Sequence, residues 1–340
     1  MAPRDGQVTS AAIPPRLLIT RRVPAEVIEQ ARGRFTTQVW NDDRPLGDLF
    51  VDRAKGYDAL MIMANDRLDA VAIDALRPTL RAVATYSVGH EHIDLAAATR
   101  AGLPVCNAPD ALNEAVAEIA LYLILAAARR TRRAEHALRT GDWPPWSPSF
   151  MVGMQLTGKR LGIYGMGAIG REIAVRARAF GMAIHYFNRQ RLAPELEQRA
   201  TYHATLESLL GVSEVLCVAA PSTPQTRSSL DRARLLLLPP GAIVVNIARG
   251  DLIDEDALIE LVRQDRLGPV GLDVFRNEPR IDPRLKDLPE AVLLPHIGSA
   301  TTQARIAMGL RALQGLEQHF CGALPENCLN IEAYAPPSRT

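Results

Sequence analysis

Three polar residues with complementary chemistry follow apolar runs in the second half of the chain. Arg249 follows "VVNIA", Glu278 lies in "GLDVFRNEP", and His296 follows "LLP". If the runs are strands of one parallel sheet, their carboxyl ends open on the same edge and bring these side chains together. A guanidinium, a carboxylate and an imidazole at one edge suit the reduction of a 2-keto acid by hydride transfer.

Each of the three residues has a distinct expected role. Arg249 would bind the substrate carboxylate and stabilise the negative charge that develops on the keto oxygen. His296 would donate the proton, and Glu278, hydrogen-bonded to it, would keep that proton available near neutral pH. Taken singly, such a histidine is more often structural and such an arginine more often a turn partner, so the combination carries the prediction.

A glycine-rich turn could bind the hydride donor. "GMGAIG" places Gly165, Gly167 and Gly170 between a strand-like run, "RLGIYG", and an alanine-rich helical stretch. In a dinucleotide-binding fold the three glycines allow a tight turn, close approach of a pyrophosphate, and close helix–strand packing. An ordinary turn between strand and helix is the alternative. The predicted contacts are Gly165, Met166, Gly167, Ala168, Ile169 and Gly170.

The second strand of this unit ends in "HYFNRQR", without the acid that would accept hydrogen bonds from the ribose of NAD. Neutral Asn188 is followed by Arg189, Gln190 and Arg191, and guanidinium groups bind phosphate by charge-assisted hydrogen bonds. We therefore predict that these four residues contact the cofactor and that NADPH is preferred, with NADH possible. The alternative is that both arginines form a solvated surface pair.

The elements that would position these residues form two α/β domains with doubly wound parallel sheets of the Rossmann or flavodoxin-like kind, separated by an interdomain cleft. Continuous apolar runs predict strands buried on both faces. Residues 1–110 and 300–340 are assigned to a substrate (catalytic) domain and 111–299 to a dinucleotide-binding Rossmann domain with six strands. One helix is predicted from about Asn113 to Leu138, and a last helix over "TTQARIAMGLRALQGLEQHF" is placed on the first domain.

Bulk properties narrow the class of protein further. The 340 residues are 47% hydrophobic and carry a net charge of +1, which gives no electrostatic case for nucleic acid or an anionic membrane as the main partner. The first residues have no apolar core of a secretion signal, and "IALYLILAAA" is too short to span a bilayer, so the expected location is cytoplasmic.

Cys106 and Cys217 are expected to be small buried hydrophobes in a reducing compartment.

With these motifs together, the sequence resembles the D-isomer-specific 2-hydroxy-acid dehydrogenase family, from about Leu17 to the last helix. The blocks that carry the resemblance are "LGIYGMGAIG", "VVNIARGDLIDEDAL", "GLDVF..EP" and "LLPHIGSAT". Within the family it looks most similar to the glyoxylate/hydroxypyruvate reductase (glycerate dehydrogenase) branch. The resemblance implies Arg249, Glu278 and His296 as catalytic residues, glyoxylate and hydroxypyruvate as substrates, and a homodimer.

The resemblance also implies further contacts. Backbone N–H groups of Val88 and Gly89 would bind the substrate carboxylate, and Asp273 would hold the nicotinamide carboxamide. Trp146 of "WPPWSP" matches a tryptophan that reaches the partner subunit's substrate pocket in relatives; a buried loop anchor is the alternative. The remaining expected cofactor contacts are Asn113, Ala220, Pro221 and Ile247, and the remaining substrate contacts are Met63, Ala64 and Ser299.

The sequence departs from the family at two positions. Asn113 stands where threonine is common, and Ala168 stands where arginine is frequent, which removes one possible cation from the pyrophosphate site. His90 and His92 have the spacing of a metal pair without a third ligand, so structural roles are expected and no metal.

Other functions remain as alternatives. They are a dinucleotide-sensing regulator of the corepressor kind and another specificity for D-2-hydroxy acids, such as 2-ketogluconate reduction. Formate oxidation is disfavoured by Glu278, because relatives with that activity carry glutamine there. Phosphoglycerate oxidation is disfavoured because no acid follows the second strand and no regulatory domain follows the last helix.

Overall fold

The computed structural model describes residues 13–334, and the chain divides into two compact units. Unit 1 comprises Met1–Leu112 with Thr301–Thr340, and unit 2 comprises Asn113–Ala300. These boundaries lie close to residues 110 and 299, where the sequence analysis placed them. The prediction about a secretion signal falls mainly on residues 1–12, which lie outside the described residues.

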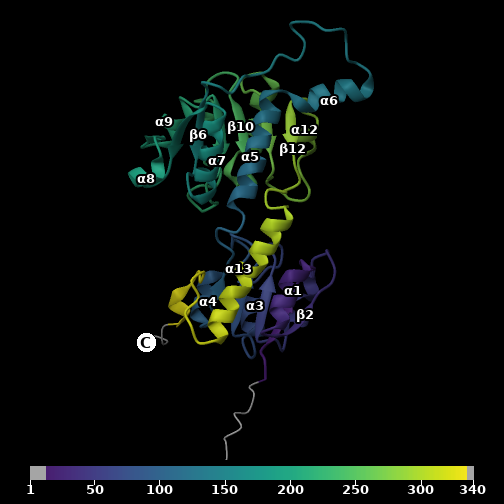
Figure 1. The fold of residues 1–340 in the computed structure, drawn as a ribbon, viewed down its shortest axis with the longest axis vertical. Helices are drawn as coiled ribbons and strands as arrows, with labels where there is room; N and C mark the ends of the chain where they lie inside the picture. The colour runs from purple at the N-terminus through teal and green to yellow at the C-terminus, as the bar shows by residue number, and fades with distance from the viewer. Residues whose placement is uncertain (1–12, 335–340) are drawn as a thin grey trace, which may run out of the picture. The chain divides into compact units, whose positions relative to one another are not determined.

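Unit 1 contains a five-stranded parallel sheet in the order β2-β1-β3-β4-β5 (Figure 1). Helices α1 and α13 pack against each other, and α13 also covers β3, β4 and β5. Residues of α2, α3 and α4 share a hydrophobic core with side chains of the opposite sheet face. The strands are β1 (Arg16–Ile19), β2 (Thr36–Val39), β3 (Ala59–Ile62), β4 (Ala82–Thr85) and β5 (Val105–Cys106). The helices are α1 (Ala25–Arg32), α2 (Phe50–Ala54), α3 (Ala70–Leu76), α4 (Leu95–Arg100) and α13 (Thr302–Phe320).

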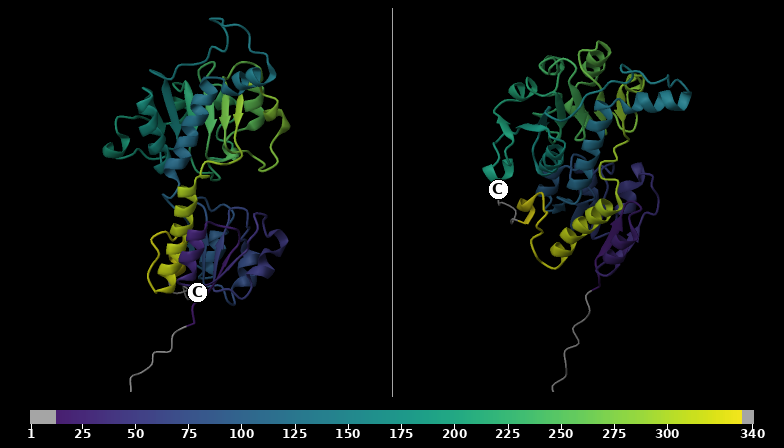
Figure 2. Two further views of the ribbon diagram at one scale, coloured as in Figure 1. Left: turned by 45° about the vertical axis from the view of Figure 1, so that its right-hand side comes forward. Right: turned by 45° about the horizontal axis from the view of Figure 1, so that its top comes forward.

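Unit 2 contains a seven-stranded parallel sheet in the order β12-β11-β10-β9-β6-β7-β8 (Figures 1 and 2). Helices α5 and α7 pack together on one face, and α9, α10 and α11 contribute to the core on the other. The strands are β6 (Arg160–Tyr164), β7 (Ala183–Phe187), β8 (Thr201–His203), β9 (Val215–Val218), β10 (Ile243–Asn246), β11 (Val270–Leu272) and β12 (Ala291–Leu293). The helices are α5 (Asn113–Ala128), α6 (Thr131–Thr140), α7 (Ala168–Ala179), α8 (Pro194–Glu197), α9 (Leu206–Leu210), α10 (Arg232–Leu235), α11 (Glu255–Arg263) and α12 (Pro283–Lys286).

Both sheets confirm the predicted class, α/β with two doubly wound parallel sheets. In each order the strand sequence reverses direction once, between β1 and β3 in unit 1 and between β6 and β9 in unit 2. In sheets of this kind, ligands bind beyond the carboxyl ends of the strands at this point of reversal. The glycine turn follows β6, and it therefore lies at the reversal point of unit 2.

Two expectations about unit 2 were wrong. The sheet has seven strands rather than six, because the edge strand β8 has only three residues and none of them is buried. The predicted helix from Asn113 to Leu138 is two helices, because Arg130 adopts a left-handed conformation with φ of 53° and ends the first. Glu290 forms ion pairs with Arg130 and Arg133 at this break, at 3.5 and 3.2 Å.

Most residues of helix α5 are buried in the core of unit 2. Within residues 13–334, no helix combines the length and the apolar character that a bilayer crossing requires.

Candidate active site

Glu278 and His296 form the hydrogen bond that the sequence predicted. The Nδ1 atom of His296 lies 2.7 Å from Oε2 of Glu278, and the N–H of Phe275 donates to Oε1 at 2.8 Å. Burial opposes ionisation of Glu278, but the bonds from His296 and Phe275 and the charge of Arg249 outweigh it and lower its pKa. The carboxylate is therefore the ionised partner of the imidazole.

The turn that carries His296 holds the ring in a defined position. His296 follows β12 and Pro295, and its φ of 54° lies in the left-handed region, which is uncommon for a residue with a side chain. Its own N–H donates to the carbonyl of Leu294 at 3.1 Å. About half of the His296 side chain is exposed, at 48%. The ring is therefore anchored through Nδ1 and open to solvent elsewhere, as a proton donor must be.

Asp273 fixes the chain just beyond this histidine. It follows β11, is buried, and accepts hydrogen bonds from the N–H groups of Ile297 at 2.8 Å and Gly298 at 2.7 Å. Burial raises the pKa of Asp273, while these two donors lower it in part. The structure thus gives Asp273 a positioning role: it ties the end of β11 to the turn after β12.

Arg249 follows β10 and reaches the same edge of the sheet. Its charge lowers the pKa of Glu278, and one guanidinium nitrogen donates to the carbonyl of Ala248 at 2.7 Å. The next residue, Gly250, lets the chain after β10 pack against the backbone of Phe275. A Cβ at Gly250 would lie 1.9 Å from the carbonyl carbon of Phe275. Asn246 braces the turn by donating to the carbonyl of Arg249 at 2.8 Å. Gly250 was not singled out from sequence.

The glycine turn has the geometry that a dinucleotide requires. Gly165 has φ of 96°, and a Cβ there would lie 2.5 Å from the backbone of Ala220 at the end of β9. A Cβ at Gly170 would meet the carbonyl of Gly165 at 2.6 Å, whereas one at Gly167 would meet nothing within 4 Å. Gly167 begins α7 without a side-chain cap, so the first N–H groups of the helix face an open space that suits a phosphate.

The segment after β7 differs from the expectation in one respect. Asn188 accepts from the N–H of Met166 at 2.7 Å and thereby braces the glycine turn. Arg191 is not free for a phosphate, because it forms a bidentate pair with Glu197 at 2.8 and 3.0 Å. Arg191 and Tyr186 together hold the pKa of Glu197 at about 2. Among the described residues, Arg189 has no acidic partner and its side chain is exposed.

The remaining predicted cofactor and substrate positions of unit 2 lie at strand or helix ends. Ala220 is buried and Pro221 is exposed directly after β9, and Ile247 is buried after β10. Ser299 lies half-buried in the turn after β12, and Asn113 begins α5. These places are compatible with ligand contacts, and their roles stay predictions.

In unit 1 the predicted substrate contacts follow β3 and β4. Val88 and Gly89 are half-buried, and within residues 13–334 their backbone N–H groups have no hydrogen-bond acceptor. Ser87 donates to the carbonyl of Gly89 at 2.6 Å, and Asn107 donates to that of Val88 at 2.9 Å. The carbonyl groups are thus fixed while the N–H groups are available for an anion.

A buried ion pair supports the turn after β3 and was missed from sequence. Arg21 lies 3.1 Å from Asp66, and the two side chains are 9% and 1% exposed. Asp66 also accepts from the N–H of Met63 at 2.9 Å, so it sets the path of the chain through Met63 and Ala64. An isolated "TRR" after an apolar run carries no signal that one arginine is buried.

His92 takes part in a hydrogen bond within unit 1. His92 contacts the Thr85 hydroxyl at 3.0 Å through Nε2. Within the part of the chain that the structure describes, no cluster of three or more histidine, cysteine or acidic residues could hold a metal ion.

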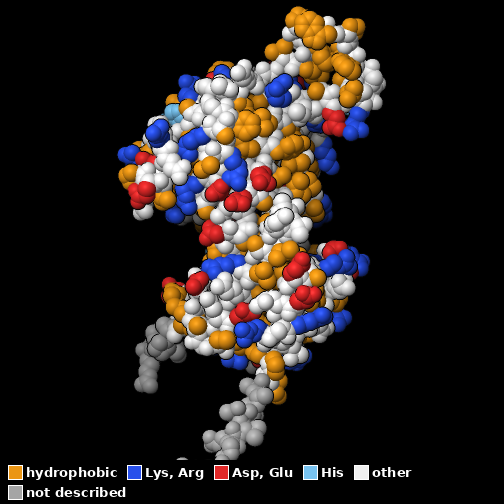
Figure 3. All heavy atoms as spheres, in the orientation of Figure 1, with side chains coloured by type: hydrophobic (Ala, Val, Ile, Leu, Met, Phe, Trp, Pro, Cys, Tyr) orange, Lys and Arg blue, Asp and Glu red, His pale blue; other side chains and the backbone are white. Residues whose placement is uncertain are grey.

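Trp146 lies in the segment after α6, where hydrophobic side chains gather on the surface (Figure 3). Its side chain is 87% exposed, so the alternative of a loop anchor buried within the chain is wrong. Trp143 and Val152 of the same segment are also largely exposed, at 67% and 62%.

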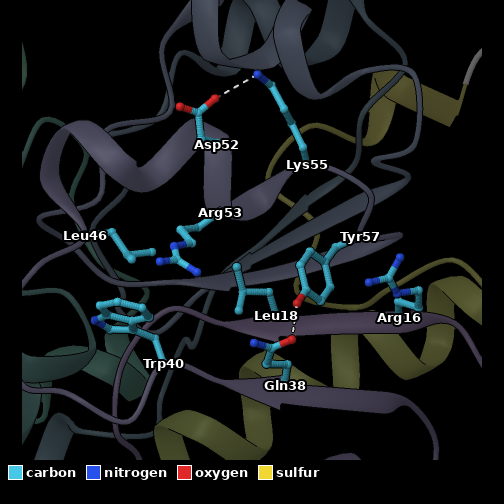
Figure 4. Close-up of a pocket in the computed structure, with 9 residues that line it drawn as sticks. All are labelled: Arg16, Leu18, Gln38, Trp40, Leu46, Asp52, Arg53, Lys55 and Tyr57. Atoms are coloured by element: carbon cyan, nitrogen blue, oxygen red, sulfur yellow. Dashed lines mark hydrogen bonds and ion pairs between the residues drawn. The ribbon is translucent and has the colours of Figure 1, made fainter.

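A cavity of about 300 Å³ in unit 1 contains none of the predicted substrate residues. Figure 4 shows it beside β1 and β2, where the Tyr57 hydroxyl donates to the Gln38 side chain and Lys55 pairs with Asp52 at 2.8 Å. Its lining comprises Arg16, Leu18, Gln38, Trp40, Leu46, Asp52, Arg53, Lys55 and Tyr57. We therefore do not assign it to the reaction.

The fold and the glycine turn of unit 2 define a dinucleotide-binding protein. Residues 121–298 match the model of the D-isomer specific 2-hydroxyacid dehydrogenase, NAD binding domain. The chain belongs to the D-isomer specific 2-hydroxyacid dehydrogenase family and is an NAD(P)-dependent oxidoreductase.

Curated relatives extend the match to nearly the whole chain. Glycerate dehydrogenase of Hyphomicrobium methylovorum is 42% identical over 311 residues, covering 91% of this chain and 97% of that protein. Glyoxylate reductase of Thermococcus kodakarensis is 38% identical over 323 residues, covering 94% and 97%.

Solved structures show the same architecture. A glyoxylate reductase from Paecilomyes thermophila has a TM-score of 0.84 at 33% identity, covering 93% of this chain and 98% of that chain. An NADPH-dependent glyoxylate/hydroxypyruvate reductase from Sinorhizobium meliloti, in complex with NADP and malonate, has a TM-score of 0.80 at 30% identity, covering 94% and 98%.

Proposed function

We propose that the chain reduces short 2-keto acids of the glyoxylate and hydroxypyruvate type to 2-hydroxy acids, with NADPH as the preferred hydride donor. The observation that carries the proposal is the Glu278–His296 hydrogen bond, with the charge of Arg249 beside it. The relatives named glycerate dehydrogenase and glyoxylate reductase support the substrate class.

The three residues divide the work of the reaction. When bound, the nicotinamide cofactor supplies the hydride. Arg249 binds the substrate carboxylate and stabilises the negative charge that develops on the keto oxygen, in a site where such charge is worth more than in water. His296 gives a proton to that oxygen. Glu278 orients the imidazole through Nδ1, stabilises its charged form, and leaves Nε2 to face the substrate.

Two features of the cofactor site support the proposal of a dinucleotide with an additional phosphate. The space in front of Gly167 and the uncapped N-terminus of α7 suit the pyrophosphate. Arg189, exposed and without an acidic partner among the described residues, is the guanidinium available for a 2′-phosphate. Arg191 contributes less because Glu197 already neutralises it. The name of the Sinorhizobium meliloti structure supports the use of NADPH.

Unit 1 would contribute to substrate binding through backbone groups. The N–H groups of Val88 and Gly89, which have no acceptor among the described residues, would bind a carboxylate, and Met63 and Ala64 would contact the small side group.

We also propose that the protein is a homodimer and that the segment around Trp146 lies in the interface. Trp143, Trp146 and Val152 expose apolar surface that a second copy would cover. Light scattering should give twice the chain mass of 37.1 kDa for the native protein and a smaller average mass for a Trp143→Ser, Trp146→Ser double variant. A monomeric native protein would contradict this proposal.

A steady-state panel tests the proposed reaction. Glyoxylate, hydroxypyruvate, pyruvate and 2-ketogluconate would each be measured with NADPH and with NADH. We expect the highest kcat/KM with NADPH and one of the first two acids. A preference for 2-ketogluconate would change the substrate assignment, and equal or better use of NADH would remove the cofactor assignment.

A further inference from the structure

Two cysteines far apart in the sequence lie opposite each other in unit 1. Cys106 ends β5, and Cys328 lies in the segment that follows α13. The two residues form an antiparallel bridge. Hydrogen bonds on both sides define the register: the N–H of Asn107 donates to Asn327 at 3.2 Å, and the N–H of Leu329 donates to Val105 at 2.7 Å.

This register makes the cysteines a non-hydrogen-bonded pair, in which the side chains approach most closely. Opposed Cα atoms in such pairs are about 4.5 Å apart. A disulfide requires roughly 4.4–6.8 Å between Cα atoms, and the typical spacing of this register lies within that range. The two thiols are near enough for each to shift the pKa of the other.

We propose that Cys106 and Cys328 are a modification site: a dithiol that a small-molecule disulfide converts into an intramolecular disulfide. This goes beyond the proposed reductase activity and does not depend on it. The bond would join β5 to the C-terminal segment of the same unit.

The two thiols have different roles in the exchange. Cys106 is buried and closely packed, since a Cβ at Gly315 of α13 would lie 2.7 Å from its sulfur. Cys328 is partly exposed. The neighbouring Cys106 thiol lowers the pKa of Cys328 to about 7, and the backbone at Asn330 and Val105 adds to this effect. Cys328 is therefore the nucleophile that the oxidant can reach.

The chemistry balances as two successive exchanges. The Cys328 thiolate attacks one sulfur of the small disulfide, forms a mixed disulfide and releases one small thiolate. Cys106 then loses its proton and attacks the sulfur of Cys328, which breaks the mixed disulfide and releases the second small thiolate. The protein loses two electrons and two protons, and the small disulfide is reduced to two thiols.

The consequence would be local to one edge of the unit 1 sheet. Directly after Cys106, Asn107 donates to Val88 at 2.9 Å, and the N–H of Ala108 donates to Ser87 at 2.9 Å. Asn107 and Ala108 follow β5 and hydrogen-bond the turn that contains Ser87 and Val88. A disulfide at Cys106 would therefore stabilise the end of β5 and, through it, this turn. Because the bond would close a long loop, it should also raise the melting temperature.

The test uses the full-length protein, oxidised glutathione as the oxidant, and mass spectrometry after alkylation under denaturing conditions. We expect one disulfide that joins the Cys106 and Cys328 peptides, while Cys217 and Cys321 stay free. Cys106→Ser should retain glutathione on Cys328, because the second thiol is missing, and Cys321→Ser should behave as the native protein.

Three results would overturn the proposal. One is a stable glutathione adduct on Cys328 in the native protein, because Cys106 would then fail to resolve it. Another is a cross-link through Cys321. The third is a native protein that keeps all four thiols after prolonged exposure. Oxidation should also raise the melting temperature of the native protein and leave that of Cys328→Ser unchanged. Keto-acid reduction is not the readout, so failure here is distinguishable from failure of the proposed function.

Discussion

The imidazole of His296 and the carboxylate of Glu278 lie 2.7 Å apart although they follow different strands, β12 and β11. A second bond from the N–H of Phe275 fixes the other carboxylate oxygen. The Glu278 carboxylate therefore has a fixed orientation. Because it binds Nδ1 of His296, Nε2 is the ring nitrogen that points away from Glu278.

Replacing Glu278 with glutamine removes the negative charge and keeps the shape. We expect kcat to fall about tenfold or more, because the protonated imidazole loses its stabilising partner. Steady-state kcat with glyoxylate and NADPH, measured beside that of the native protein, checks this. A kcat within twofold of the native value would contradict the role of Glu278.

Two glycines of the same turn should respond differently to alanine. Gly170→Ala places a Cβ 2.6 Å from the carbonyl of Gly165, so it should lower the melting temperature. Gly167→Ala meets nothing within 4 Å and should leave the melting temperature unchanged, but it should raise the KM for NADPH by crowding the pyrophosphate. Thermal melts and cofactor KM values for both variants separate packing from binding. An unchanged cofactor KM in Gly167→Ala would argue against this turn as the phosphate site.

The two arginines after β7 should contribute unequally to cofactor choice. Arg189→Ala should raise the KM for NADPH about tenfold, which is about 1.4 kcal/mol, and leave that for NADH nearly unchanged. Arg191→Ala should have the smaller effect on NADPH, because Glu197 already pairs with Arg191. Arg263→Ala, an exposed arginine at the end of α11, is the matched control. A larger rise in the KM for NADPH in Arg191→Ala than in Arg189→Ala would contradict this order. It would show that Arg191 breaks its ion pair with Glu197 and binds the 2′-phosphate.

The buried Glu197 predicts a stability change in acid. Its folded pKa of about 2 lies below the ordinary 4.5, so its contribution is complete above about pH 4.5 and is lost as the pH falls towards 2. The melting temperature of the native protein should exceed that of Glu197→Gln at pH 7, and the difference should shrink over this window. Glu195→Gln, on the exposed side of the same short helix, is the control. A difference independent of pH would mean that the charge of Glu197 contributes nothing.

The sequence predicted the strands that are buried on both faces, because a continuous apolar run such as "VLCV" allows few other structures. It did not predict the edge strands β2 and β8. Their residues, "TTQV" and "TYH", are partly exposed and carry no continuous apolar signal. The break between α5 and α6 was also missed, because arginine gives no sign of the left-handed conformation that Arg130 adopts.

For the site, residue type and position after a strand were sufficient to predict the hydrogen bond between Glu278 and His296. Contacts that depend on the fold of the chain after β7 were not predictable from the sequence. Glu197 reaches Arg191 from the short helix α8, and Asn188 turns back onto Met166, so both depend on how the chain folds beyond the second strand. The catalytic roles themselves stay predictions until they are measured.

The most direct test of the reaction is the turnover of His296→Ala with glyoxylate and NADPH at saturating concentrations. The account predicts that kcat falls on the order of a hundredfold or more. Binding of NADPH, followed by fluorescence, should stay within about twofold, because His296 is not among the proposed cofactor contacts. Near-normal kcat in this variant would contradict the assignment of His296 as the proton donor.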